Sequence, residues 1–224
     1  MKRVCMMMIG GLGLLSLKTN AQTQQVEVGG TTFGIRAGVN FQNINGKDFS
    51  GDRLENKLKT GWHAGVNAEI PVAPEFYVQP GLIFSTKGAR LDQDLGDADK
   101  LNLSYLELPV NFLYKPTLGT GKLLVGLGPY IAYGIGGKIK GGNQDIDVKF
   151  KNKVKTGEAA DAAYFKPFDA GANFLVGYEF SNKVSAQLNA QLGLANMNSK
   201  YEAAPDGDAR AANTGFGLSV GYRF

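Results

Sequence analysis

The chain contains little cysteine, little proline and, beyond its first two dozen residues, no long apolar run. Its single cysteine, Cys5, lies in the amino-terminal segment, so the rest of the chain can form neither a disulfide nor a thiolate site. Eight prolines and a mean hydropathy of -0.15 accompany 31 glycines. No later stretch has the roughly 20 apolar residues that a membrane-spanning helix needs. These shortages exclude a disulfide-built fold and a bundle of membrane helices.

The first 21 residues have the composition of a secretory signal peptide. Met-Lys-Arg supplies positive charge, VCMMMIGGLGLLSL an apolar core, and Thr19-Asn20-Ala21 a small-residue cleavage site. We expect cleavage before Gln22, a short lead over residues 22–31 and one domain over residues 32–224; an uncleaved anchor is the alternative. Without Lys2, Arg3 and Lys18, 21 of the 24 basic residues remain against 20 acidic ones. This balance gives no support for nucleic-acid binding.

The remaining sequence alternates large apolar residues with small or polar ones at every second position. In GWHAGVNAEI, Trp62, Val66 and Ile70 share one face, and His63 and Asn67 lie on the other. Similar segments recur at about 31–42, 61–70, 76–87, 104–115, 122–135, 168–180, 184–196 and 213–224. Short connectors alternate with long polar ones. This pattern predicts an all-β fold, an eight-stranded antiparallel up-and-down transmembrane β-barrel with short periplasmic turns and long outer loops.

The two faces of the predicted strands favour lipid outside and side chains inside. The apolar faces are continuous and edged with aromatic residues, while glycine, Asn and Gln dominate the other faces, as a narrow eight-stranded lumen requires. A soluble periplasmic ligand-binding barrel with its faces reversed is one alternative, and a ten-stranded barrel that uses the third long loop is another. Pro80, Pro109 and Pro129 fall within strands and lack the N–H that a ladder needs. We expect bulges there, or positions where the missing hydrogen bond is tolerated.

Several motifs, in order along the chain, resemble a known family. They are FGIRAGVNF, FYVQPGLIFSTKGA, YLELPVNFLYK, GLGPYIAYGIGGK, FDAGANFLVGYEF and the final GYRF. Together they resemble the PorT-like outer-membrane β-barrel domain family typical of Bacteroidetes, with an OmpA/OmpX-like architecture, and the resemblance covers nearly all of the mature chain. The resemblance implies a location in the cell outer membrane. It also implies that Tyr222 and Phe224 form a carboxy-terminal signal for the outer-membrane assembly machinery.

Charged residues on the inward faces are predicted to form two tiers in the lumen. Alternating strand directions place Arg36, Glu69, Glu179 and Arg223 near the periplasmic end, and His63, Lys87, Glu107 and Asp169 nearer the outer end. Buried charges are costly unless they are paired, so each tier is interpreted as part of a structural plug. Two alternatives remain open. One is a narrow porin-like pore with a gated or proton-conducting path. The other is a lipid-modifying enzyme in which His63 is a general base with Asp169 and a loop serine such as Ser104.

Two outer loops carry further candidate sites. Asp92, Asp94, Asp97 and Asp99 have a spacing that could wrap a calcium ion, but Gly96 and Leu103 break the EF-hand pattern, so a solvated acidic loop is the simpler interpretation. In the third loop, DIDVKFKNKVK alternates apolar residues with charged ones. This alternation suggests that the strands continue beyond the membrane as a hairpin, which could bind a partner along its edge. Its lysines could instead protect that edge or contact anionic sugars.

The sequence therefore predicts a structural or surface-interaction role through the outer loops, with no catalysis, no cofactor and no metal. The expected partners are outer-membrane lipid and lipopolysaccharide, the outer-membrane assembly machinery and an unknown extracellular partner; nucleic acid is not expected.

Overall fold

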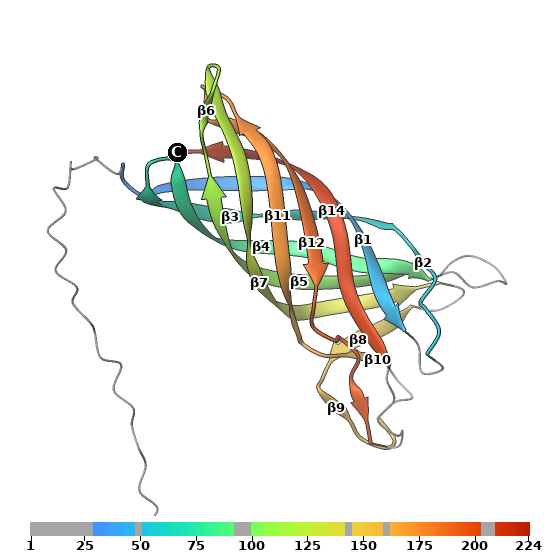
Figure 1. Ribbon diagram of the computed structural model, residues 1–224. Coiled ribbons are helices and arrows are strands. Elements are labelled where there is room, and N and C mark those ends of the chain that lie inside the picture. Colours follow the sequence, from blue (N-terminus) through green and yellow to red (C-terminus); the bar gives the residue numbers. More distant parts are fainter. Residues whose placement is uncertain (1–28, 48–50, 92–99, 142–144, 159–161, 203–208) are drawn as a thin grey trace, which may run out of the picture.

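The computed structural model describes residues 29–47, 51–91, 100–141, 145–158, 162–202 and 209–224. Eight long strands form a closed barrel in which every strand is antiparallel to both neighbours (Figure 1). Around the wall these strands are β1 (Thr32–Lys47), β3 (Lys59–Ala73), β4 (Phe76–Leu91), β5 (Lys100–Tyr114), β7 (Gly121–Lys140), β11 (Phe168–Glu179), β12 (Val184–Gly193) and β14 (Arg210–Arg223). The eight-stranded prediction is confirmed, and the ten-stranded alternative is wrong.

Alternation along each strand puts the large apolar side chains outside the barrel. On β14, Leu218 and Val220 are 53% and 61% exposed, whereas Ser219 between them is 4% exposed. Trp62, Leu127 and Phe174 on other strands are likewise about half exposed or more, and Asn40, Gln79 and Asn111 are buried in the lumen. This arrangement is the reverse of a soluble ligand-binding barrel. No helix in the described part of the chain is long and apolar enough to cross a membrane.

One end of the barrel, termed here the short-turn end, carries the tight connections and the carboxy terminus (Figure 1). Its turns use a left-handed backbone at Glu75 and Lys183, both with φ of 66°, and at Gly119, with φ of 62°. The small strand β6 (Thr117–Leu118) pairs with the start of β7 there. These turns join β3 to β4, β5 to β7 and β11 to β12, as the short connectors predict.

The opposite end, termed the long-loop end, carries a small folded unit. Strand β8 (Ile146–Phe150) pairs antiparallel with the last residues of β7, so the expected hairpin is present. Strand β10 (Ala163–Phe165) adds parallel to β8, and β9 (Lys153–Val154) pairs with β13 (Lys200–Tyr201). Strand β2 (Asn56–Lys57) pairs with β4. We refer to residues 145–158, 162–167 and 194–202 as the outer cap.

A carboxylate orders one turn of the outer cap. Lys151 Nζ lies 2.7 and 2.9 Å from the two carboxylate oxygens of Glu158, and the Lys155 N–H donates to the same group at 3.1 Å. The hydrogen bonds from the Lys151 side chain and from the Lys155 N–H lower the pKa of the Glu158 carboxyl. The group stays ionised under neutral conditions and links the two ends of this turn.

The three mid-strand prolines coincide with interruptions in the wall. The β4–β5 ladder passes from the pair Pro80 and Val110 directly to Ile83 and Glu107. Residue pairs are also missing from the β5–β7 ladder after the pair Pro109 and Tyr130. They are missing from the β3–β4 ladder after the pair Asn67 and Gly81. The two register shifts lie elsewhere, between Pro71 and Ala73 and beside Ser104 and Tyr105. The prolines therefore occupy gaps in pairing, where no ladder hydrogen bond is lost, which is the second of the two expected arrangements and not a bulge. We call this line of gaps the proline seam.

Candidate functional site

The charged groups nearest the short-turn end form a buried network around Glu69. Lys115 Nζ donates to Glu69 Oε2 at 2.7 Å and to Glu179 Oε2 at 2.9 Å. Arg223 forms an ion pair with the other oxygen of Glu69, and Gln79 Nε2 donates to that oxygen at 3.2 Å. Glu69 and Lys115 are almost completely buried. We call Glu69, Lys115, Glu179 and Arg223 the short-turn tier, in which each carboxylate has a cationic partner.

This tier differs in one member from the set that the sequence predicts. The structure brings Glu69, Glu179 and Arg223 together, but Lys115 rather than Arg36 completes them. Lys115 directly follows β5, and the alternation that puts Glu107 and Asn111 inside also puts Lys115 inside. Extending the alternation of β5 past the last residue of the strand would have identified Lys115 as an inward-facing residue. The placement of Arg36 in the first tier is wrong, because its side chain lines the next layer of the lumen.

Above the short-turn tier the lumen is filled by apolar side chains. Leu113, Leu124 and Leu175 are buried against one another, and Tyr77 packs on them. The Lys115 ammonium lies 5.4 Å from the centre of the Tyr77 ring. Beside this layer, Asn111 Nδ2 donates to Gln79 Oε1 at 3.4 Å and Gln79 donates to Glu69, so two amides connect the first ionic network to the polar interior.

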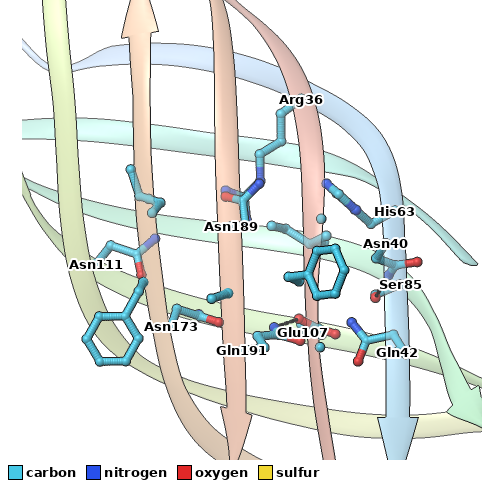
Figure 2. A pocket seen from close by; sticks show the side chains of 17 residues that line it. Arg36, Asn40, Gln42, His63, Ser85, Glu107, Asn111, Asn173, Asn189 and Gln191 are labelled. Atoms are coloured by element: carbon cyan, nitrogen blue, oxygen red, sulfur yellow. Dashed lines mark hydrogen bonds between the residues drawn. The ribbon is translucent and has the colours of Figure 1, made fainter. Parts of the chain in front are cut away.

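A small polar cavity of about 50 Å³ follows in the middle of the barrel. Figure 2 shows amide and charged side chains converging on it from several strands, among them Arg36, Asn40, Gln42, Glu107 and Asn111. Arg36 Nε and the side-chain oxygens of Asn40, Gln42 and Asn111 are buried without a protein partner. A cavity of this size and polarity suits a few bound water molecules and is too small for an organic ligand.

The second ionic network lies towards the long-loop end and is centred on Lys87. Lys87 Nζ lies 3.1 Å from Glu107 Oε1 and 3.2 Å from Asp169 Oδ2, and all three side chains are almost fully buried. Asp169 Oδ2 also accepts hydrogen bonds from Tyr130 at 3.3 Å and from Asn213 at 3.0 Å. We call Lys87, Glu107 and Asp169 the long-loop tier. The Lys87 ammonium therefore forms ion pairs with two carboxylates.

The ring of Tyr130 also contacts the buried lysine, since Lys87 Nζ lies 4.4 Å from its centroid. Gln191 Nε2 donates to the second oxygen of Glu107 at 2.7 Å. The aromatic ring and the amide thus add to the two ion pairs in holding the tier together.

His63 does not join the long-loop tier with which the sequence groups it. Its Nε2 lies 2.8 Å from Ser219 Oγ, which also accepts a hydrogen bond from Asn189. Asp169 is held by Lys87, and Ser104 lies between the buried residues Leu103 and Tyr105 and so faces outward. The structure therefore does not assemble His63, Asp169 and Ser104 into a catalytic triad.

Apolar side chains close the lumen at the long-loop end. Leu101, Leu103 and Tyr105 of β5 pack there with Ile44 of β1, and the outer cap adds Val148 and Met197. Phe150 also packs on this cluster, and its ring lies 5.7 Å from that of Tyr105. The outer cap is thus joined to the barrel through a shared core.

The remaining predicted sites lie at the edges of the described structure. Tyr222 and Phe224 are exposed on the lipid-facing side with ring centroids 5.4 Å apart, and the Phe224 N–H donates to the Phe33 carbonyl at 2.8 Å. Asp92, Asp94, Asp97 and Asp99 lie outside the described residues, as do the predicted signal peptide and most of the lead. Within the described ranges, no group of three or more His, Cys, Asp or Glu side chains could hold a metal ion.

Comparison with known proteins agrees with this architecture. The model of a family described as "Outer membrane protein beta-barrel domain" matches residues 20–199. No curated protein matches the chain significantly. The matched span contains seven of the eight long strands and ends before β14, which closes the wall between β12 and β1.

Proposed function

Because the chain belongs to the outer membrane protein beta-barrel domain family, we propose that this integral outer-membrane barrel is a closed support for its outer cap, through which it interacts at the cell surface. The observation that carries the proposal is the filled lumen. Two ionic tiers and two apolar layers occupy it around a central cavity of about 50 Å³, and the open hollow of about 490 Å³ at the short-turn end is lined by the short-turn tier and Tyr77. The finer assignment to the PorT-like barrels of Bacteroidetes is part of this proposal and is supported by the order of the sequence motifs.

The lumen is proposed to be non-conducting. We expect the refolded protein to give no steady current steps in planar bilayers. A variant in which residues 145–158 are replaced by a short turn loses Val148 and Phe150 from the outer apolar layer. It is also expected to stay closed, because both ionic tiers remain. Stable current steps from the unaltered protein would contradict the proposal and favour a narrow pore.

Catalysis is likewise not expected. The only histidine, His63, is buried and lies within hydrogen-bonding distance of Ser219. Of the other two candidates for a catalytic triad, Asp169 pairs with Lys87 and Ser104 faces outward. A lipid-modifying activity that disappears in His63→Ala would overturn this part of the proposal.

The proposed partners act at three levels of the barrel. Outer-leaflet lipid and lipopolysaccharide surround the wall, the assembly machinery reads Tyr222 and Phe224, and an extracellular partner binds the outer cap. The cap suits the last role because its strands β8, β9, β10 and β13 and its shared core give it a defined shape.

Site-specific photo-crosslinking on intact cells tests the role of the outer cap. A photoreactive residue at Lys149, exposed on β8, is expected to yield a defined adduct. The same residue at Asn182, exposed in the turn between β11 and β12, serves as the control and is expected not to yield that adduct. An identical adduct from both positions, or none from Lys149 and its cap neighbours, would count against surface interaction through the cap.

A further inference from the structure

Strand pairing at the long-loop end brings basic residues together in two rows. In one row Arg90 of β4 lies opposite Lys100 of β5, which lies opposite Lys140 of β7. In the other, Arg210 of β14 lies opposite Lys47 of β1, which bridges to Arg53. All six side chains are exposed. We call Lys47, Arg53, Arg90, Lys100, Lys140 and Arg210 the outer cationic belt.

Direct opposition of like charges in a sheet is unfavourable, so the belt requires an explanation. Directly opposed residues on neighbouring strands have Cα atoms only about 4.5–5.5 Å apart. The ion pairs found in the described outer loops involve other lysines, Lys138 with Asp147 and Lys151 with Glu158. Two exposed acids lie beside Arg53 in the sequence, Asp52, which has an interaction of its own, and Glu55. The belt thus concentrates six basic side chains in two rows of opposed positions at the long-loop end.

One row of the belt borders a hollow in the surface. Asn45, Lys47, Arg53 and Arg210 line a space of about 830 Å³ together with Gly46 and Leu54. The Arg210 guanidinium donates to the Leu194 carbonyl at 2.9 Å, which orients it at the rim. The polar groups of this hollow are cationic side chains and one amide. Such a surface suits a group that carries more than one negative charge.

The height of the belt above the apolar part of the barrel wall indicates which anionic groups surround it. On β5, Leu106 is the last exposed large apolar residue, and Lys100 lies six residues beyond it. At roughly 3.3 Å per residue and a tilt of about 40°, Lys100 stands about 15 Å above Leu106 along the barrel axis. In an outer membrane this level holds the sugars of the outer-leaflet glycolipid, which carry phosphate and carboxylate groups.

We propose that the outer cationic belt binds the anionic sugar groups of glycolipid molecules packed against the β14–β1 and β4–β5–β7 sides of the barrel. The inference rests on the proposed orientation, with the long loops outside the cell. The neighbouring glycolipid supplies the charge that the cross-strand pairs lack. The barrel would then carry a bound shell of glycolipid on these sides.

Binding of purified lipopolysaccharide by the full mature chain in detergent tests this proposal. Two triple variants remove one row each, K47Q/R53Q/R210Q and R90Q/K100Q/K140Q. Each is expected to weaken binding about tenfold or more. The control K149Q/K153Q/K155Q removes the same charge from exposed lysines of the outer cap and is expected to change binding less than twofold. Lipopolysaccharide treated with phosphatase is expected to bind the unaltered protein weakly.

Three results would overturn the proposal. They are equal losses in the control and belt variants, unchanged binding in both belt variants, and equal binding of dephosphorylated lipopolysaccharide. A fourth variant, D92N/D94N/D97N/D99N, removes the acidic groups between Arg90 and Lys100 in the chain and is expected to bind at least as tightly. A loss there as large as in the belt variants would assign binding to that loop instead.

A heat-dependent gel-mobility shift, run on every variant, separates this test from that of the proposed function. A retained shift shows a folded barrel, so a binding failure then concerns the belt alone. Loss of the shift in the unaltered protein would instead count against the membrane barrel itself.

Discussion

Replacement of Lys87 with methionine is expected to destabilise the barrel by roughly 3–5 kcal/mol, because it strands two buried carboxylates. Lys87 Nζ is the cation within ion-pairing distance of both Glu107 and Asp169. Methionine has a similar volume, so the loss reports charge rather than packing. The free energy of unfolding can be measured by guanidinium titration in lipid vesicles. The fluorescence of Trp62, the one tryptophan, which lies on the lipid-facing side, reports the transition.

Two further variants identify the cause of that loss. Lys138→Met removes a cation from an exposed pair with Asp147 at 3.7 Å and is expected to cost less than about 1 kcal/mol. The triple variant K87M/E107Q/D169N removes the buried charges together and is expected to recover most of the lost stability. If Lys87→Met were as mild as Lys138→Met, the long-loop tier would not be the buried ionic plug described above.

Replacement of Gly38 with alanine is expected to cost roughly 3 kcal/mol, at the upper end of what overpacking does. A Cβ at this position would lie 2.0 Å from the Leu218 carbonyl oxygen and 2.8 Å from both His63 Cε1 and Ser219 Cα. Two of these contacts are backbone of β14, which cannot turn aside as a long side chain can. The same guanidinium titration measures the effect.

Gly136→Ala is the matched control for this substitution. A Cβ there would meet nothing within 4 Å, and the residue lies in β7 without a positive φ. Its expected effect is within roughly 0.5 kcal/mol of zero. Equal effects at Gly38 and Gly136 would mean that the lumen has room for added side chains and that its glycines are not needed for close strand approach.

The wall of the barrel could be predicted from the sequence because lipid and lumen select opposite residue types at alternate positions. Trp62 and His63 show this choice clearly, since one lies outside and the other inside. Alternation fixes the face of a residue but not its height, which depends on the stagger between strands. Arg36 therefore lies on the predicted inner face but in a different layer, and its place in the short-turn tier is taken by Lys115, which the prediction did not include. The partner of His63 was missed for the same reason, because Ser219 is 156 residues away in the chain.

The outer cap was only partly predictable. The alternation of DIDVKF indicated a hairpin, and β8 forms one with β7. The role of Met197, which has 1% of its surface exposed, has no periodic signal in the sequence. It becomes part of a core only when the connection between β12 and β14 meets the connection between β7 and β11 at the long-loop end. Contacts between two irregular segments of this kind leave no pattern within either one.

The proline seam gives the wall an uneven mechanical character. A complete hydrogen-bonded ladder resists bending equally around a barrel, but here three successive ladders each skip pairs near Pro80, Pro109 and Pro129. When the thickness of the surrounding bilayer changes, the wall must adjust its tilt and curvature at some cost. The β3–β4–β5–β7 side has the fewest ladder bonds to strain, so deformation should concentrate there. The β11–β12–β14–β1 side would remain stiff and hold its part of the outer surface at a constant height.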